Sequence, residues 1–486
     1  MKYKMLNLVV VTRTLGVLLL LYSIAIIPPL LISVGYQDGE WPYWLIIWME
    51  SVLLGWVMWW PLRRKALDLR RRDGFVIVTL FWFVLGLISA VPFLFMPQLD
   101  FSDAVFEAIS AFTTTGATVI VGLDLLPPSI LFWRQELQWL GGIGMIVTAV
   151  AILPTLGIGG MQLYQAEMPG PFKGEKLTPR IAQTARAFWI IYGGMTVVCA
   201  LAYWLAGMSL FDAVAHSFST VSTGGFSTHD DNFAYFNSPL IEFIACLFML
   251  LGGMNFSVHY LAIYRGSFDQ YWRNEEVRTF LIMVVILITI TSTTLFFSTT
   301  YADPITALRY AAFQAISVVT NTGFGTATFA NWALFLPLLL ISFSFVGGCA
   351  GSTAGGIKVI RFLLLIKQAR REIYRLVPPH IVRSLKFDRR VIPEEVTSAI
   401  WGFFSLYILL FVTLVLLLMA NGLDQVTAFG AAATCLNNLG PGLGEVAASF
   451  TGVSDGTKWL LSFTMIVGRL EVFTAFVLLS RIFWRG

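Results

Sequence analysis

Charged residues are scarce in this chain. Asp, Glu, Lys and Arg make up only 12% of its 486 residues, whereas soluble domains carry about 25%. Cysteine and histidine number four each, and none has the spacing of a disulfide framework or a metal site. The sequence also contains no recognisable pair of a nucleophile and a base that would indicate an enzyme. We therefore expect no catalytic centre, no organic cofactor and no nucleic-acid partner, and we expect buried free thiols at Cys199, Cys246, Cys349 and Cys435.

Long apolar runs are abundant instead. Hydrophobic residues make up 57% of the chain, and a membrane-spanning helix needs about 20 of them in succession. The start could be read as a signal peptide, but no small-residue cleavage site follows, so we expect a retained first span. The sequence predicts an all-α polytopic membrane protein with ten spans near 8–34, 43–62, 75–97, 129–153, 185–207, 238–264, 279–299, 333–366, 396–420 and 457–483.

The charges sort by side of these predicted spans. The loops near 63–73, 173–186, 265–278 and 367–390 are basic, whereas the intervening loops are acidic with almost no Lys or Arg. Cytoplasmic loops of membrane proteins carry such an excess of basic residues. We therefore expect the basic loops and both termini in the cytoplasm, as an even number of spans allows.

A short polar stretch recurs four times between spans: EAISAFTTTGAT (107–118), HSFSTVSTGGFS (216–227), QAISVVTNTGFG (314–325) and AAATCLNNLGPG (431–442). In each stretch a Ser or Thr stands six residues before a glycine. These pairs are Ser110 and Gly116, Ser219 and Gly225, Ser317 and Gly323, and Thr434 and Gly440. Gly224 is an alternative to Gly225 in the second stretch, but the register of Ser219 favours Gly225.

The segment before each glycine has about 12 residues, too few to cross a membrane. Each one reads as a re-entrant helix and loop, which is tolerated at membrane depth only where protein or water surrounds it. The prediction is thus two leading spans followed by four span–loop–span repeats around one pore. The boundaries we expect are 1–73 for the leading part and 74–183, 184–275, 276–393 and 394–486 for the repeats.

Four such loops can bind a cation. Each short helix would direct the negative end of its dipole at the centre, and glycine adopts dihedral angles closed to other residues. Rings of backbone carbonyls can then replace the hydration shell of a monovalent cation. No acidic side chain repeats in the loops, which favours K⁺ over divalent ions. Packing of small residues between helices explains one such glycine but not four. His216, behind the second loop, is expected to hold its helix by a hydrogen bond.

The eighth span is interrupted by GGCAGSTAGGIK at 347–358. Glycine disfavours a helix by about 1 kcal/mol relative to alanine, so we expect a break beneath the loops that obstructs a pore and moves aside. A packing kink is the alternative. Lys358 could present its charge near the pore, but we favour snorkelling of its side chain to the cytoplasm.

Arg469 lies within the last span, where a central arginine costs several kcal/mol. We expect it to line the pore and take part in gating. The alternative is a buried ion pair with a carboxylate on another span, such as Glu242. Glu471 should point to a different face from Arg469.

The loop sequences TTTGAT, STGGFS, NTGFGT and NNLGPG, together with GGCAGSTAGGIKVIR and the two leading spans, resemble the Trk/Ktr/HKT superfamily of potassium transporters. The likeness covers essentially the whole chain and is greatest to the bacterial Trk membrane subunit. It implies a K⁺-binding filter at Thr114, Thr115, Gly116, Thr223, Gly224, Gly225, Asn321, Thr322, Gly323, Asn438, Leu439 and Gly440. With the break described above, it implies a gate at Gly347, Gly348, Gly351, Ser352, Thr353, Gly355, Gly356, Lys358 and Arg469.

The resemblance also implies a homodimer in the lipid of the bacterial inner membrane, with one pore per protomer. A cytosolic, nucleotide-binding regulatory subunit of the RCK type would dock on the basic face. In the plant branch a serine replacing the first-repeat glycine favours Na⁺, so Gly116 favours K⁺. The fourth loop departs from the pattern, because Leu439 brings no hydroxyl and Pro441 follows the glycine.

We therefore predict potassium uptake through a gated, K⁺-selective pore. The alternatives are a symporter that couples K⁺ to H⁺ or Na⁺, and a less selective K⁺/Na⁺ pore. Coupled carriers usually place ion sites on broken helices of inverted repeats, whereas these repeats share one orientation. A partner would act through the 154–186, 265–278 and 367–393 loops, although their basic charge could serve topology alone.

Overall fold

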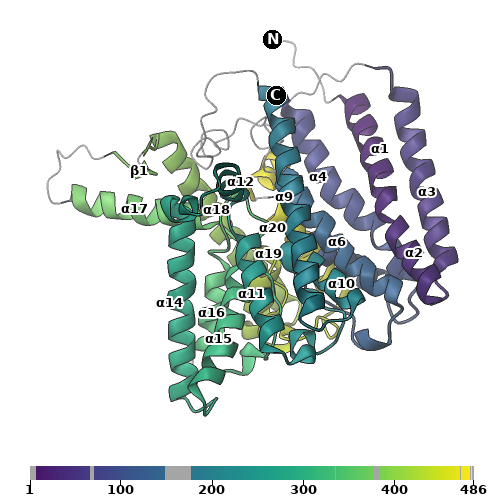
Figure 1. Ribbon diagram of the computed structural model, residues 1–486. Helices are drawn as coiled ribbons and strands as arrows, with labels where there is room; N and C mark the ends of the chain where they lie inside the picture. The colour runs from purple at the N-terminus through teal and green to yellow at the C-terminus, as the bar shows by residue number, and fades with distance from the viewer. Residues whose placement is uncertain are drawn as a thin grey trace, which may run out of the picture.

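The computed structural model describes residues 7–65, 71–147, 177–333, 335–376, 384–388, 390–470, 472–481 and 483. This part of the chain is mostly helical, which confirms the predicted class (Figure 1). Its strands are β1 (Lys386–Phe387) and β2 (Arg390–Val391), which pair as an antiparallel hairpin. Parts of the basic loops at 63–73, 154–186 and 367–393 lie outside the described residues, as do His380 and Glu471.

Within the described residues, six helical stretches are long and apolar enough to cross a membrane. They are Leu8–Tyr36, Trp41–Leu62, Arg72–Phe95, Thr184–Leu205, Glu275–Phe297 and Glu394–Ala420. They correspond to helices α1 (Leu8–Ala25) with α2 (Ile27–Tyr36), α3 (Trp41–Trp59), α4 (Arg71–Ile88), α9 (Leu177–Leu205), α14 (Glu275–Phe297) and α18 (Glu394–Ala420). The first two lie together at one side of the molecule (Figure 1). The predicted leading pair is therefore present, and each repeat has a first span.

The second spans of the repeats are interrupted more often than the sequence suggested. The predicted break after α16 (Leu336–Ser344) is present, and α17 (Val359–Arg375) follows it. However, the expected single span at 238–264 is α11 (Pro239–Gly253) and α12 (Phe256–Arg265), bent by 99°. The last span also divides, into α20 (Asp455–Arg469) and α21 (Val472–Leu479). Among the described residues only α6 (Pro128–Val147) is uninterrupted in this position.

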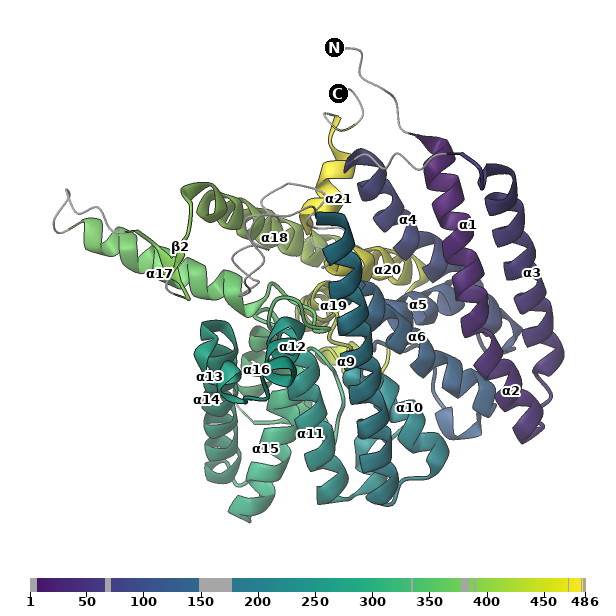
Figure 2. The same ribbon diagram turned by 45° about the horizontal axis from the view of Figure 1, so that its top comes forward.

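The bend between α11 and α12 has a local cause. Gly252 and Gly253 weaken the end of α11, and the Asn255 side chain accepts a hydrogen bond from the Ser257 N–H (2.8 Å), which caps a new helix. Helix α17 departs still further from the direction of the long helices. It projects from the body of the molecule in both views (Figure 1, Figure 2), and its sequence VIRFLLLIKQARREIYR combines an apolar run with five basic residues.

Four short helices lie between the first and second spans: α5 (Phe101–Phe112), α10 (Leu210–Val221), α15 (Pro304–Val319) and α19 (Gln425–Asn437). All four begin at a side-chain cap, which supplies an acceptor for an otherwise unpaired N–H. The caps are Asp100, Ser209, Asp303 and Asp424. The remaining elements are α13 (Asp269–Arg273) and 3₁₀ turns at Trp60–Leu62, Val91–Phe95, Leu123–Leu125, Asn232–Phe236, Phe329–Asn331 and Gly444–Val446.

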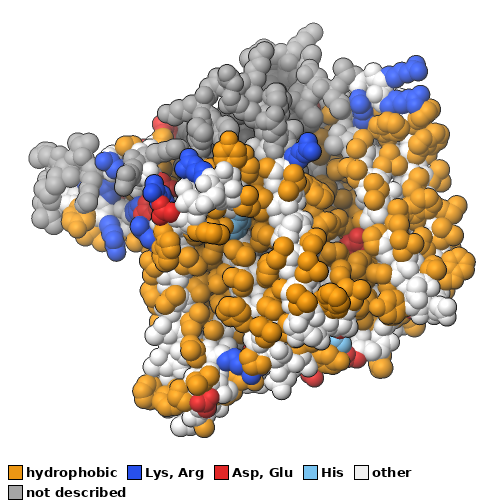
Figure 3. Space-filling view, in the orientation of Figure 1, with side chains coloured by type: hydrophobic (Ala, Val, Ile, Leu, Met, Phe, Trp, Pro, Cys, Tyr) orange, Lys and Arg blue, Asp and Glu red, His pale blue; other side chains and the backbone are white. Residues whose placement is uncertain are grey.

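The flanks of the molecule are apolar. Figure 3 shows hydrophobic side chains over the face formed by α9, α11 and α14, with many of the Lys and Arg side chains toward one end. Large apolar side chains such as Phe243 of α11 and Ile282 and Val285 of α14 are exposed there, as expected of surfaces that meet lipid. Three of the four free cysteines are buried as predicted, and Cys246 is partly exposed.

Candidate functional site

The chain takes the same backbone course after each of the four short helices. The residue two positions before the predicted glycine has a left-handed backbone conformation. Thr114, Thr223 and Asn321 have φ of 54°, and Asn438 has φ of 55°. The glycine itself is left-handed as well, with φ of 80° at Gly116, 85° at Gly225, 85° at Gly323 and 101° at Gly440. In the second repeat the equivalent position is therefore Gly225 rather than Gly224.

The recurring Ser or Thr six residues before the glycine has a backbone role. Its carbonyl accepts the N–H of the residue that precedes the glycine, which closes a wide turn at the helix end. The four bonds are Thr115 to Ser110 (2.8 Å), Gly224 to Ser219 (2.8 Å), Thr322 to Ser317 (2.8 Å) and Leu439 to Thr434 (2.9 Å). This repeated turn explains why sequences as different as TTTGAT and NNLGPG align.

The four loops close into a ring, which we call the loop ring: Thr115–Gly116, Gly224–Gly225, Thr322–Gly323 and Leu439–Gly440. Each glycine faces the carbonyl oxygen that precedes the glycine of the next loop. A Cβ atom built on Gly116 would lie 2.3 Å from the Gly224 carbonyl oxygen, and one on Gly225 would lie 1.9 Å from that of Thr322. A Cβ on Gly323 would lie 2.0 Å from the Leu439 carbonyl oxygen, and one on Gly440 would lie 2.9 Å from that of Thr115. The last contact returns to the first loop, so the four loops surround one axis. The fourth glycine has the most room.

Buried polar side chains of the short helices form hydrogen bonds to the segment that follows the glycine. Glu107 Oε2 accepts the Val119 N–H (3.0 Å). His216 Nε2 lies 3.0 Å from Ser227 Oγ, which confirms the hydrogen bond expected of this residue. In the third repeat, Gln314 Nε2 donates to the Ala327 carbonyl (2.8 Å).

Position 431, the equivalent in the fourth repeat, is alanine and cannot form such a bond. There Thr427, one helical turn earlier, accepts the Glu445 N–H with its hydroxyl (3.1 Å). The fourth quadrant is therefore fixed differently from the other three, as its sequence suggested.

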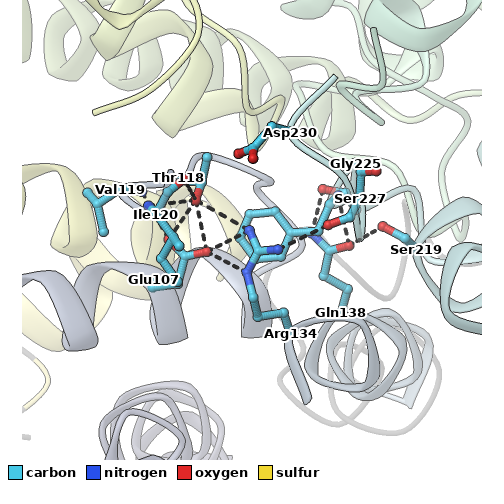
Figure 4. A network of polar contacts seen from close by, with 12 residues as sticks. Glu107, Thr118, Val119, Ile120, Arg134, Gln138, Ser219, Gly225, Ser227 and Asp230 are labelled. Atoms are coloured by element: carbon cyan, nitrogen blue, oxygen red, sulfur yellow. Dashed lines mark hydrogen bonds and ion pairs between the residues drawn. The ribbon is translucent and has the colours of Figure 1, made fainter. Parts of the chain in front are cut away.

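Helix α6 reinforces the first and second loops from behind (Figure 4). Arg134 Nε donates to Glu107 Oε1 (2.8 Å) and its Nη1 donates to the Ser227 carbonyl (3.0 Å). Its guanidinium also lies 4.1 Å from the centre of the Phe226 ring. One helical turn on, Gln138 Nε2 donates to the Gly224 carbonyl (2.7 Å). Sequence reasoning missed both α6 residues, although polar side chains within an apolar span were a signal that could have found them.

Glycines in the second spans let the short helices approach closely. A Cβ on Gly141 would lie 1.9 Å from the Phe112 carbonyl oxygen, and on Gly468 it would lie 2.3 Å from that of Leu436. These carbonyls belong to the last turns of α5 and α19, so the glycine motifs that follow the loops serve close packing behind the loop ring.

The 347–358 segment forms a folded loop, which we call the 347–358 loop. Its two ends pair with each other, since Ile357 N–H donates to the Phe345 carbonyl (2.9 Å) and Lys358 N–H to that of Val346 (3.0 Å). Its first half joins α11, because Cys349 N–H donates to the Gly253 carbonyl (2.8 Å).

The tip of the 347–358 loop reaches between repeats 2 and 4. The Thr353 hydroxyl donates to the Val221 carbonyl (3.1 Å) and lies 3.2 Å from the Thr223 hydroxyl, on the helix side of the loop ring. From the opposite direction, Arg469 Nη1 donates to the Thr353 carbonyl (3.0 Å). A Cβ on Gly355 would lie 1.9 Å from the Asn437 carbonyl oxygen of repeat 4. The loop therefore lies across the inner side of the loop ring.

The structure corrects the expectation that Lys358 snorkels, and it excludes an ion pair between Arg469 and Glu242. Lys358 does not snorkel: its side chain is buried and its Nζ donates to the Ala354 carbonyl within the 347–358 loop. Arg469 is also buried, and its contact is the Thr353 carbonyl rather than Glu242. Glu242 instead pairs with Arg309 (2.6 Å). The described residues give Arg469 Nε and Nη2 no hydrogen-bond partner.

A carboxylate that sequence reasoning missed anchors the 347–358 loop from outside. Glu276 Oε1 accepts the Ala350 N–H (2.7 Å) and the Ile360 N–H (3.3 Å). The adjacent Glu275 contacts α17 and the β hairpin instead, through an ion pair with Lys367 and a hydrogen bond from the Asp388 N–H (3.2 Å). Two successive carboxylates at the start of α14 thus join the 347–358 loop to the hairpin and α17.

On the other side of the loop ring lies a cavity of about 570 Å³. Its walls include all four ring glycines and the residues that follow them, among them Phe226, Phe324 and Pro441. His229 and Asp230 stand at this cavity and tie two repeats together. His229 Nδ1 contacts Asp124, and Asp230 accepts the Gly122 N–H (3.0 Å). The loop ring therefore separates an open vestibule from the 347–358 loop.

Comparison with known proteins gives consistent results. Residues 44–484 match the family model TrkH, described as a cation transport protein. The chain is 50% identical over 477 residues to the Trk system potassium uptake protein TrkH of Salmonella typhimurium, covering 98% of this chain and 99% of that protein. It is 49% identical, with the same coverage, to the protein of that name from Escherichia coli strain K12. The crystal structure of the potassium transporter TrkH from Vibrio parahaemolyticus aligns with a TM-score of 0.92 at 48% identity, covering 99% of this chain and 100% of that one.

Proposed function

Since this chain belongs to the TrkH family of cation transport proteins, we propose that it takes up potassium and that K⁺ passes through the loop ring. Its relatives are named as transport proteins, in agreement with the prediction that the chain is not an enzyme. The observation that carries the proposal is the closure of the ring, in which each glycine faces the next loop's carbonyl and the fourth contact returns to the first loop.

The filter residues in this proposal are those that the sequence predicted in the four loops, from Thr114 to Gly116, Thr223 to Gly225, Asn321 to Gly323 and Asn438 to Gly440. Their carbonyl oxygens would replace part of the hydration shell of K⁺. The C-terminal ends of the four short helices point at the ring and add partial negative charge. Entry is from the vestibule, where Asp230 and Asp231 raise the local concentration of cations.

The gate in this proposal is the 347–358 loop with Arg469. The loop lies across the route from the ring, and the buried ammonium of Lys358 and the guanidinium of Arg469 place two positive charges beside it. A cation that leaves the ring would meet both charges. Opening requires the loop to move away from Thr223 and from the Gly252–Gly253 end of α11. The residues that would move are Gly347, Gly348, Gly351, Ser352, Thr353, Gly355 and Gly356.

We further propose a homodimer in the bacterial inner membrane, with the chain termini and basic loops in the cytoplasm. The start of α1 and helix α21 lie toward the same end of the molecule, which supports one side for both termini (Figure 2). A cytosolic regulatory subunit of the nucleotide-binding RCK type would act at α17 and the hairpin, from which Glu275 and Glu276 lead to the 347–358 loop.

Ion flux into liposomes that contain this chain alone tests the function. We expect K⁺ and Rb⁺ to enter under an imposed voltage with no other gradient, and Na⁺ and Li⁺ to enter far more slowly. Flux that needs an added H⁺ or Na⁺ gradient would indicate a coupled carrier instead of a pore. Equal flux of K⁺ and Na⁺ would indicate a less selective pore.

A further inference from the structure

The second quadrant of the loop ring lacks a side chain that the other three possess. Its residue before the ring glycine is Gly224, where the other loops have Thr115, Thr322 and Leu439. In the first and third loops the threonine hydroxyl bonds within its own loop, Thr115 to Thr113 (2.8 Å) and Thr322 to Thr320 (2.6 Å). No such bond is available to Gly224.

The space beside Gly224 is taken by Gln138 of α6, which belongs to the previous repeat. A Cβ built on Gly224 would lie 2.4 Å from Cδ and from Oε1 of Gln138. Gln138 Nε2 donates to the Gly224 carbonyl (2.7 Å), and Oε1 accepts the Phe226 N–H (3.2 Å) and the Ser219 hydroxyl. One buried amide therefore holds the chain on both sides of Gly225 (Figure 4).

We propose that Gln138 is a specificity-determining residue of the filter. Its amide occupies the space of the absent side chain at position 224. It sets the position of the Gly224 carbonyl and the strength of the electric field that this carbonyl presents to the cation. This inference depends on the proposed function, because only an ion-conducting ring makes the carbonyl count toward selectivity. Selection between K⁺ and Na⁺ depends on the number and field strength of the coordinating carbonyls. The Gly224 oxygen already accepts one N–H, so its field toward the cation is weaker than that of a carbonyl without such a donor.

The side chain is suited to this role because it is fully buried. Removing it leaves the buried Phe226 N–H and Ser219 hydroxyl without their acceptor, which costs free energy. The Gly224 carbonyl would then be free to turn toward or away from the axis. The quadrant would lose the uniform geometry that a ring selective for one ion radius needs.

The test compares ion selectivity in liposomes for Gln138→Leu, which keeps the volume and removes the amide. We expect the ratio of K⁺ to Na⁺ flux to fall about tenfold, with Na⁺ flux rising. Gln135→Leu is the matched control. Gln135 is buried on the same helix, and its amide has no hydrogen-bond partner among the described residues. Its substitution should leave the ratio unchanged.

A rescue experiment separates specificity from simple misfolding. Gly224→Thr alone should impair selectivity, because its Cβ meets Gln138. Gly224→Thr combined with Gln138→Ala should recover most of the K⁺ preference, since the threonine then fills the space and restores the pattern of the first and third loops. A folded double variant that does not recover the K⁺ preference would contradict the inference.

The results also distinguish this inference from the function on which it depends. A wild-type chain that does not prefer K⁺ overturns the filter itself. A selective wild-type chain together with a folded, equally selective Gln138→Leu variant overturns only the role of Gln138. If Gln138→Leu does not fold, the double variant decides, and its failure to select K⁺ overturns the inference.

Discussion

Glu107 and Arg134 form an ion pair that is closed to solvent, with 2.8 Å between Arg134 Nη2 and Glu107 Oε1 and exposures of 0% and 1% for the two side chains. The pair joins the short helix of the first repeat to its own second span. Arg134 continues to the Ser227 carbonyl, so the same guanidinium also holds the second loop. Two quadrants of the loop ring therefore depend on one buried charge.

The first prediction follows from that dependence. Arg134→Met should lower the stability of the protein by about 3–5 kcal/mol, because it leaves the Glu107 carboxylate buried without its partner. Thermal unfolding in detergent measures the loss. The double variant Glu107→Gln with Arg134→Met should be less affected than the sum of the two single variants. A single variant as stable as the wild type would contradict the prediction.

The second prediction concerns Gly323. Serine there would have to adopt φ of 85° and bring its Cβ to 2.0 Å from the Leu439 carbonyl oxygen. We expect Gly323→Ser to relax selectivity from K⁺ toward Na⁺, as measured by the ratio of fluxes in liposomes. Gly325→Ser is the control, because a Cβ there meets no atom closer than 3.8 Å. Unchanged selectivity in Gly323→Ser would count against the filter assignment.

Arg469 gives the third prediction. Arg469→Ala removes a positive charge and the hydrogen bond to the Thr353 carbonyl, so K⁺ flux should rise severalfold, as loss of one charged hydrogen bond implies. Arg469→Lys keeps the charge and should give an intermediate flux. If all three proteins conduct equally, Arg469 has a structural role instead.

The fourth prediction tests the anchor of the 347–358 loop. Glu276→Gln replaces a charged acceptor of the Ala350 N–H with a weaker neutral one, and Glu276→Met removes the acceptor altogether. We expect K⁺ flux without any regulatory subunit to rise in that order. Glu275→Gln is the matched control, because its contacts are with α17 and the hairpin rather than with the loop. Equal flux in the Glu276 variants and the wild type would refute the anchoring role.

His229 gives a pH dependence at the vestibule. Partial burial opposes protonation of this ring, but the carboxylates of Asp212 and Asp124 outweigh it and raise the pKa of His229 above its ordinary value. A raised pKa means that the stabilisation is complete below the ordinary pKa and is lost as pH rises through the raised one. The thermal unfolding temperature of the wild type should therefore exceed that of His229→Gln at about pH 6, and the difference should shrink toward about pH 9. A difference that does not change with pH would contradict this assignment.

Much of the ring could be predicted because its sequence signals are local. The left-handed turn at Gly116 and the carbonyl of Ser110 that closes it lie six residues apart, so one repeat read against the others reveals both. The break at 347–358 was predictable for the same reason, since glycines disfavour a helix wherever they stand. The apolar runs predicted the helical membrane class, and the recurring loops predicted the four repeats.

The side chains that act across repeats could not be predicted in this way. Gln138 and Gly224 are 86 residues apart, and Glu276 and Ala350 are 74 apart, so no spacing connects them. Lys358 was misplaced because snorkelling is the usual solution for a lysine near a membrane surface. The Ala354 carbonyl that accepts the hydrogen bond of its ammonium is in place only once the 347–358 loop has folded.

The four quadrants of the loop ring are encoded separately within one polypeptide. A channel assembled from four identical subunits changes four positions with every mutation, whereas a mutation here alters a single quarter. The second quarter already differs from the first because the Gln138 amide of another repeat supports it. The fourth quarter differs because it contains Leu439 and Pro441. In the filter that we propose, ion preference could therefore be adjusted in small increments by natural variation or by design, one quarter at a time, without changing the other three loops.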